Sequence, residues 1–131
     1  MRIEHGSRAV AVARAHVEAW TQHDWSAAEE LLADDVTVLV TTTQPTMKDT
    51  NTSGVVEYMR GLKEFAEKVV PGSLVVNANL GNERNALLVV TVEAALGPGG
   101  SKVRLPAARL YLLDERDRIA AERVVFFVTP A

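Results

Sequence analysis

Residues 13–35 (ARAHVEAWTQHDWSAAEELLADD) constrain the fold most, because they predict two successive helices that lead directly into a strand. The apolar side chains of the first helix recur at helical spacing and form one stripe, which consists of Ala9, Ala13, Val17 and Trp20. Asp24 follows a break in this pattern and is a good N-cap for the second helix, since its carboxylate can accept a backbone N–H. The β-branched sequence VTVLVTT that follows is typical of a strand.

The remaining chain predicts one further helix and a series of strands. We expect helices from residue 6 or 7 to 22, at 25–33 and at 54–70, and strands at 36–42, 73–80, 86–96, 102–113 and 118–129. The polar, proline-interrupted segment 41–54 is expected to be a surface loop, with Thr52 or Ser53 capping the third helix. Gly61 inside that helix costs about 1 kcal/mol against alanine, which favours close packing as the reason for it.

Three helices followed by a sheet predict an α+β fold, a single domain over residues 1–131 with helices on one face of a mostly antiparallel sheet. The turns GNERN, GPGGS and DERDR are short, so the last four strands should form an antiparallel meander. The strand sequences VVTVEAAL and RVVFFV are apolar on both faces. We therefore expect a homodimer in which a second subunit buries the outer sheet face.

The composition excludes several kinds of site and partner. The chain has no cysteine, which rules out disulfides and thiolate ligands, and its three histidines lack the spacing of a metal triad. With a net charge of −3 and scattered basic residues, we expect no nucleic acid partner. We find no apolar run near the roughly 20 residues of a membrane span and no signal peptide, so a cytoplasmic protein without a membrane partner is expected. The glycine-rich turns open no helix as a phosphate loop does, and no cofactor is expected.

The motifs AR-x-x-x-E…HDW…LLADDVTV and L-x-x-LDE-x-x-RI, in this order and spacing, resemble the nuclear transport factor 2-like superfamily. Within it, nearly the whole chain is similar to the ketosteroid isomerase and SnoaL-like polyketide cyclase branch. The resemblance implies a cone-shaped, cystatin-like fold, in which three N-terminal helices pack in the concave face of a strongly curved sheet and a pocket opens between them. Many members of the superfamily dimerise through the outer sheet face.

The resemblance also shows where this chain departs from the ketosteroid isomerases. Their carboxylate base would fall at Val40, their oxyanion-holding tyrosine at His16 and their second acid at Arg109. Because a valine cannot move a proton, the familiar isomerase route is not expected here. Two positions match better, since Tyr58 corresponds to a supporting tyrosine and Phe126 to an aromatic wall.

Arg109 is the first candidate site residue, because strand alternation places it in an otherwise apolar row. Such a charge needs a partner. Across the DERDR hairpin the facing residue is about Glu122 or Arg123, and Glu122 would share the inner face with Phe126. An Arg109–Glu122 pair is therefore predicted, either as a structural ion pair or as part of a functional site.

His16 is the second candidate, because an imidazole can accept and return a proton near neutral pH. It lies at the edge of the helical stripe, where Tyr58 could hydrogen-bond to it. The alternative to a catalytic role is a structural histidine at the edge of the core, with a neighbouring residue as its hydrogen-bond partner.

Two hypotheses for the function follow. In the first, the chain is a cofactor-free isomerase, cyclase or dehydratase that acts on a small hydrophobic carbonyl compound. His16 would be the general acid–base with Tyr58 assisting, Glu122 would orient Arg109, and Arg109 would hold an enolate or a carboxylate. The apolar walls of the pocket would be Trp20, Val40, Met59 and Phe126. In the second hypothesis, the chain is a non-catalytic ligand-binding or dimeric assembly module.

Overall fold

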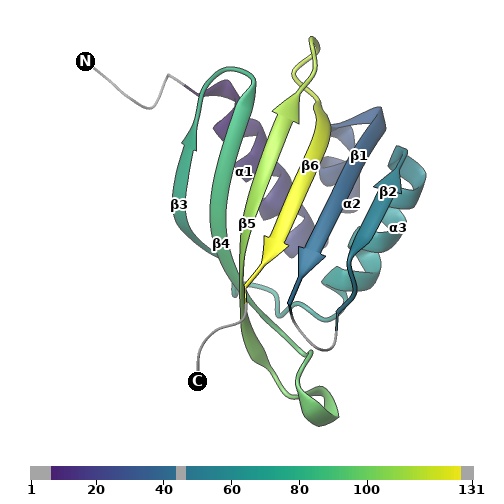
Figure 1. Cartoon of the computed structure of the whole chain (residues 1–131), viewed down its shortest axis with the longest axis vertical. Coiled ribbons are helices and arrows are strands. Elements are labelled where there is room, and N and C mark those ends of the chain that lie inside the picture. Colours follow the sequence, from purple (N-terminus) through teal and green to yellow (C-terminus); the bar gives the residue numbers. More distant parts are fainter. Residues whose placement is uncertain (1–6, 44–46, 128–131) are drawn as a thin grey trace.

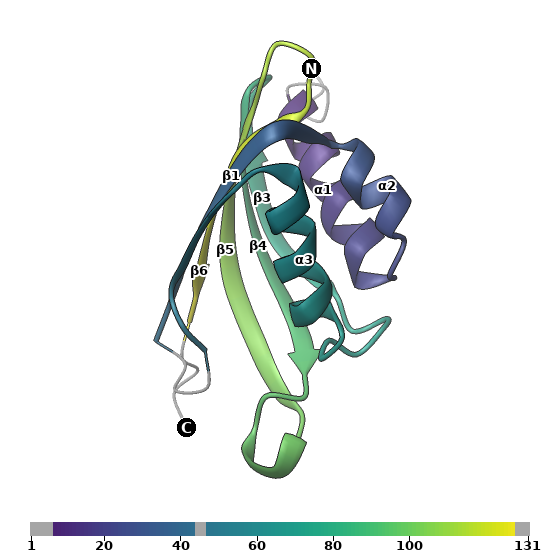
Figure 2. The same cartoon turned by 90° about the vertical axis from the view of Figure 1, so that its right-hand side faces the viewer.

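The computed structural model describes residues 7–43 and 47–127, which form two layers. The described elements are, in chain order, α1 (Arg8–Thr21), α2 (Trp25–Glu30), β1 (Leu32–Thr42), β2 (Thr50–Ser53), α3 (Val55–Ala66), β3 (Val75–Gly81), β4 (Asn85–Ala94), a short 3₁₀ turn (Pro98–Gly100), β5 (Val103–Leu113) and β6 (Ile119–Phe126). The strands form one curved sheet in the order β2-β1-β6-β5-β4-β3 (Figure 1). All three α-helices cover the same face of this sheet (Figure 2), which confirms the predicted α+β architecture.

The first two helices begin where the sequence predicts. Ser7 accepts a hydrogen bond from the backbone of Val10 at the start of α1, and Asp24 accepts one from Ala27 at the start of α2. The predicted end of α2 at residue 33 and start of the strand at residue 36 are wrong, because α2 ends at Glu30 and β1 begins at Leu32. Ile119 at the start of β6 donates its backbone N–H to the carbonyl of Leu31, so tertiary pairing draws this segment into the sheet.

The segment that was expected to be only a loop contains an edge strand. Thr50–Ser53 forms β2 and pairs with β1 in antiparallel register, with Thr52 opposite Val38. Its four polar side chains give no apolar alternation, so the backbone bonds to β1 hold the strand. The predicted caps Thr52 and Ser53 are therefore also wrong, since the N-cap of α3 is Gly54 at φ 90°. Residues 44–46 of this segment lie outside the described residues.

The last four strands form the predicted antiparallel meander, with small differences at their ends. The third helix stops at Ala66 and not at residue 70, since the chain turns there to form a bridge between Val69 and Ala94. The final strand ends at Phe126, and the last two predicted positions, 128 and 129, lie outside the described residues. Among the described strands, one pair is parallel and joins β1 to β6, so that the first of them lies beside the last.

Alternation along the strands separates a buried inner face from an open outer face. The inner face packs on α1 and α3, and its fully buried side chains include Leu88, Leu105 and Ile119. On the outer face, which no helix covers in the described part of the chain (Figure 2), Leu110 and Leu112 each remain 45% exposed. Within residues 7–43 and 47–127, we find no helix with the length and apolar character of a membrane span.

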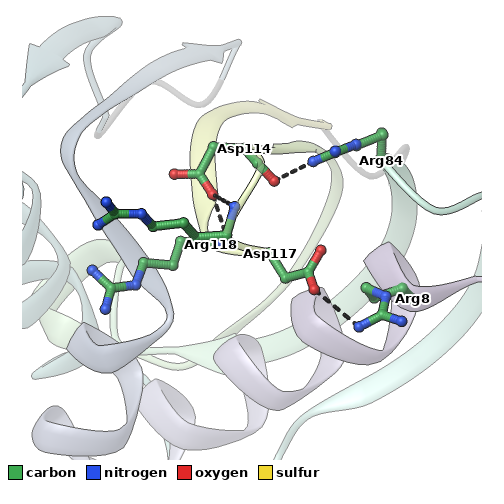
Figure 3. Close-up of polar contacts among 6 residues, drawn as sticks. Arg8, Arg84, Asp114, Asp117 and Arg118 are labelled. Atoms are coloured by element: carbon green, nitrogen blue, oxygen red, sulfur yellow. Dashed lines mark hydrogen bonds and ion pairs between the residues drawn. The ribbon is translucent and has the colours of Figure 1, made fainter.

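Polar contacts tie the tip of the β5–β6 hairpin to the start of α1 and to the β3–β4 turn (Figure 3). Arg8 forms an ion pair with Asp117 at 2.9 Å, and Arg84 donates to the backbone carbonyl of Asp114. The Asp114 carboxylate accepts the backbone N–H groups of Arg116 and Arg118. The hydrogen bond from the Arg118 backbone is the main cause that lowers the pKa of Asp114.

Candidate functional site

A cavity of about 340 Å³ lies between the inner face of the sheet and α3. Its apolar lining comes from alternate positions of β1 and β6 and from one side of α3, together with Met47 and Leu96. These apolar residues are Val38, Val40, Leu62, Phe65, Val124 and Phe126. Tyr58, Arg109 and Glu122 also line the cavity, so a small polar cluster meets an otherwise mainly apolar wall, as in typical ligand sites.

Arg109 and Glu122 form the predicted ion pair. The Arg109 Nη1 atom donates to Glu122 Oε2 at 3.0 Å, and both side chains are buried. In the register of β5 and β6, Glu122 lies opposite Tyr111 and Arg109 lies opposite Val124, so the pair reaches diagonally across the two strands. The guanidinium also lies 5.0 Å from the centre of the Trp20 ring, close enough for a cation–π interaction.

Tyr58 on α3 completes the cluster, because its hydroxyl donates to Glu122 Oε1. Both oxygens of the carboxylate thus accept a hydrogen bond, one from a neutral donor and one from a cation. Burial, followed by the negative charge of Glu122, raises the pKa of Tyr58 well above its ordinary value. The hydroxyl therefore stays protonated and donates to the ion pair of Glu122 and Arg109.

The predicted hydrogen bond between Tyr58 and His16 is wrong. The two rings lie 5.8 Å apart at 60°, and the tyrosine hydroxyl instead donates to Glu122, a charged and therefore stronger acceptor. Neither ring nitrogen of His16 has a hydrogen-bond partner among residues 7–43 and 47–127. The alternative prediction, a core-edge histidine that is hydrogen-bonded by a neighbour, is therefore also wrong. Burial lowers the pKa of His16 to about 4, against an opposing effect of Glu122, and the imidazole is neutral at neutral pH.

Sequence reasoning missed Tyr111, whose hydroxyl is buried beside the same carboxylate. This hydroxyl approaches Glu122, and its pKa is raised by burial and then by Glu122, yet in the described chain it makes no hydrogen bond of good geometry. Trp20 Nε1 and Arg109 Nε are likewise buried without a partner in the described residues. The strand alternation that indicated Arg109 also places Tyr111 on the same face, two residues later. This alternation could have identified Tyr111 as a site residue.

Of the four predicted apolar wall residues, Val40 and Phe126 line the cavity. Trp20 and Met59 belong to the core and are not part of the cavity lining found in the described chain, and neither is His16. Trp20 lies behind the wall, with its ring edge-on to Phe65 at 5.9 Å. Leu62 and Phe65 of α3 line the cavity in place of the predicted Trp20 and Met59.

Gly61 also lines the cavity, and the predicted close packing at this position is wrong. A Cβ atom built there would have no atom of the described chain within 4 Å, beyond the helix backbone itself. The glycine thus leaves space at the cavity wall. Among the described residues, no group of three or more histidine, aspartate or glutamate side chains could hold a metal ion.

Solved structures with the same arrangement of helices and sheet define the class of protein. A protein from Kribbella flavida has a TM-score of 0.72 at 22% identity, covering 92% of this chain and 87% of that chain. A putative SnoaL-like polyketide cyclase from Shewanella denitrificans has a TM-score of 0.70 at 13% identity (91% and 90% covered). An LEH-like epoxide hydrolase from M. tuberculosis has a TM-score of 0.68 at 17% identity (91% and 82% covered). Structures titled as NTF2-like proteins share this arrangement, so the fold is nuclear transport factor 2-like.

The sequence assigns the chain more narrowly. The model of the SnoaL-like domain family matches residues 13–122, so this protein belongs to the SnoaL-like family. This match confirms the resemblance predicted from the sequence motifs. None of the curated proteins matches the sequence significantly.

Proposed function

We propose that this protein binds a small, mainly apolar carbonyl compound in the cavity and catalyses a cofactor-free proton transfer on it. The observation that carries the proposal is the Tyr58–Glu122–Arg109 cluster at the wall of an otherwise mainly apolar cavity. Such a site offers a carboxylate, a cation and a hydroxyl in surroundings that exclude much of the water. The similarity to structures titled as a polyketide cyclase and an epoxide hydrolase supports chemistry on a small organic molecule.

In the proposed reaction, Glu122 is the base. Each carboxylate oxygen has a second lone pair besides the one that accepts from Tyr58 or Arg109, and one of these takes a proton from the carbon next to the ligand carbonyl. The C–H electron pair forms a carbon–carbon double bond, the π electrons of the carbonyl move onto its oxygen, and Arg109 stabilises the enolate that forms. Returning the proton to a different carbon gives an isomer. His16, expected from the sequence to be the acid–base, would instead act as a positioning residue behind Tyr58.

The test is a screen of aromatic polyketides, steroids and small enones by thermal shift and native mass spectrometry, with product analysis after incubation. A ligand at 100 times its Kd adds about 2.7 kcal/mol to the free energy of unfolding. The Glu122→Gln variant keeps the shape of the side chain and removes the base. Conversion by the wild type and not by this variant supports the proposal, and equal conversion by both contradicts it.

The alternative function is ligand binding without catalysis. It is favoured by Val40, which stands where the ketosteroid isomerases carry their base, and by the two hydrogen bonds that already occupy Glu122. In that case a ligand would bind and return chemically unchanged from every variant.

We also propose that the protein is a homodimer through its outer sheet face. A shallow hollow of about 780 Å³ on this side is lined by outward residues of β1, β4, β5 and β6, including Leu39, Leu87, Leu110 and Leu112. Exposed leucines on a sheet face without a helix are typical of a protein interface. The cytoplasmic location expected from the sequence is likewise kept as a prediction.

A further inference from the structure

The charged residues at the cavity balance one another. Among the described residues that line it, three are basic and three are acidic, namely Lys48, Lys68 and Arg109 against Glu57, Glu64 and Glu122. The lining therefore has a formal net charge of zero. The other four, Lys48, Glu57, Glu64 and Lys68, are all exposed, so that water and salt weaken their fields. The deep Arg109–Glu122 pair thus dominates the electrostatics that a bound ligand meets.

Within this pair, Glu122 already compensates the charge of Arg109. The distance of 3.0 Å from Nη1 to Oε2 leaves no separate cation for a ligand carboxylate. An anionic ligand at Arg109 would place a second carboxylate next to Glu122, with little water to screen the repulsion because both protein side chains are buried. The position beside Arg109 is therefore unfavourable for a ligand carboxylate.

A neutral carbonyl group meets complementary donors at the same place. A guanidinium has five N–H donors, and the bond to Glu122 uses one of them, on Nη1. The carbonyl oxygen of a ligand can accept from an N–H group that this bond leaves unused, without adding charge. The aromatic ring of Phe126, 5.9 Å from the guanidinium carbon, and that of Phe65 provide the apolar surface for the rest of the molecule.

We infer that the cavity selects neutral carbonyl compounds over carboxylates of the same skeleton, and that Glu122 is the residue that determines this selectivity. The inference rests on the proposed function, because it names the ligand class of the same cavity. It also narrows the two roles that the sequence allowed for Arg109, which were to hold an enolate or to hold a substrate carboxylate.

The test uses two probes of similar size, 2-acetonaphthone and 2-naphthoate, and compares their Kd values by isothermal titration at neutral pH. The wild type is expected to bind the ketone at least about tenfold more tightly than the carboxylate, which corresponds to about 1.4 kcal/mol. Glu122→Gln leaves Arg109 uncompensated, and the carboxylate should then bind more tightly than the ketone. Glu64→Gln is the matched control, since it removes the same charge from an exposed position of the lining and should leave the preference within about twofold of the wild type.

The possible results separate the selectivity from the proposed binding function. A wild type that prefers naphthoate, or a Glu122→Gln variant that folds and keeps the wild-type preference, overturns the inference and leaves the proposed binding function intact. Failure of the wild type to bind either probe overturns the selectivity together with the proposed pocket for aromatic carbonyl compounds. The double variant Arg109→Met/Glu122→Gln, which restores a net charge of zero, should lose the acquired preference for the carboxylate. If Glu122→Gln does not fold, the inference is tested by the preference between ketone and carboxylate that the wild type and the double variant show.

Discussion

Tyr58 on α3 donates a hydrogen bond from its hydroxyl to Glu122 on β6, 64 residues away along the chain. This bond connects the helical layer to the sheet at the cavity and holds the carboxylate oxygen that Arg109 does not contact. Tyr111 brings a second hydroxyl to the same carboxylate from β5, without a hydrogen bond of good geometry in the described chain.

The two tyrosines should respond differently to the loss of their hydroxyls. Tyr58→Phe removes a donor from a buried carboxylate and should lower the free energy of unfolding by about 1–3 kcal/mol. Tyr111→Phe removes a buried, unpaired hydroxyl and should leave stability unchanged or raise it slightly. Urea denaturation of both variants is the measurement. Equal losses in the two variants would show that Tyr111 makes a comparable bond in solution.

Removing one partner of the buried ion pair should be strongly destabilising. Arg109→Met leaves the charge of Glu122 without its cation and should cost about 3–5 kcal/mol. The double variant Arg109→Met/Glu122→Gln should cost less than the sum of the two single changes, because no buried charge is then left unpaired. Additive losses in a double-mutant cycle would contradict this coupling.

His16 should make the protein sensitive to mild acid. Its pKa is about 4 in the folded protein against 6.5 for an ordinary histidine, so the unfolded state binds a proton first as the pH falls. The contribution of neutral His16 to the free energy of unfolding is fully present above pH 6.5. It is lost as the pH falls from 6.5 to 4, which lowers the free energy of unfolding by up to about 3 kcal/mol. His16→Leu removes this titration, so the difference in stability between the wild type and the variant should change across that window. A constant difference would mean that His16 reaches solvent.

Two glycines provide a matched pair for backbone replacements. A Cβ at Gly81 would lie 2.6 Å from the carbonyl oxygen of Asn85 and 2.7 Å from the hydroxyl oxygen of Ser7, so Gly81→Ala should separate α1 from the β3–β4 turn and lower Tm. Gly61→Ala has open space and should raise helix stability by up to about 1 kcal/mol. Thermal denaturation checks both, and a stabilised Gly81→Ala would disprove the close approach.

The proposed dimer should depend on the outer sheet face. Leu112→Lys places a charge in the hollow on that face and should yield a monomer at concentrations where the wild type is dimeric. Val56→Lys makes the same kind of change at a position that is 70% exposed on α3, and it should leave the mass unchanged. Light scattering coupled to size exclusion gives the masses, and a monomeric wild type would end the proposal.

The sequence predicted the elements that depend on local periodicity and turn chemistry. The stripe of α1, the Asp24 cap and the inward position of Arg109 are confirmed, and the short hairpin between β5 and β6 is why the Arg109–Glu122 pair could be anticipated. What could not be predicted depends on tertiary competition. Thr50–Ser53 becomes a strand because β1 offers a free edge, and Tyr58 turns to Glu122 because a carboxylate is a better acceptor than an imidazole.

The parallel pairing of β1 with β6 has a consequence for the order of folding. Val40 of β1 lies beside Val124 of β6, about eighty residues later in the chain, and both line the cavity. The meander of β3, β4, β5 and β6 can assemble from neighbours in sequence, whereas β1 can add its long-range pairing only after β6 is in place. We therefore expect the cavity to close late in sheet assembly, and a partly folded chain that contains the meander alone would lack the β1 wall of the site.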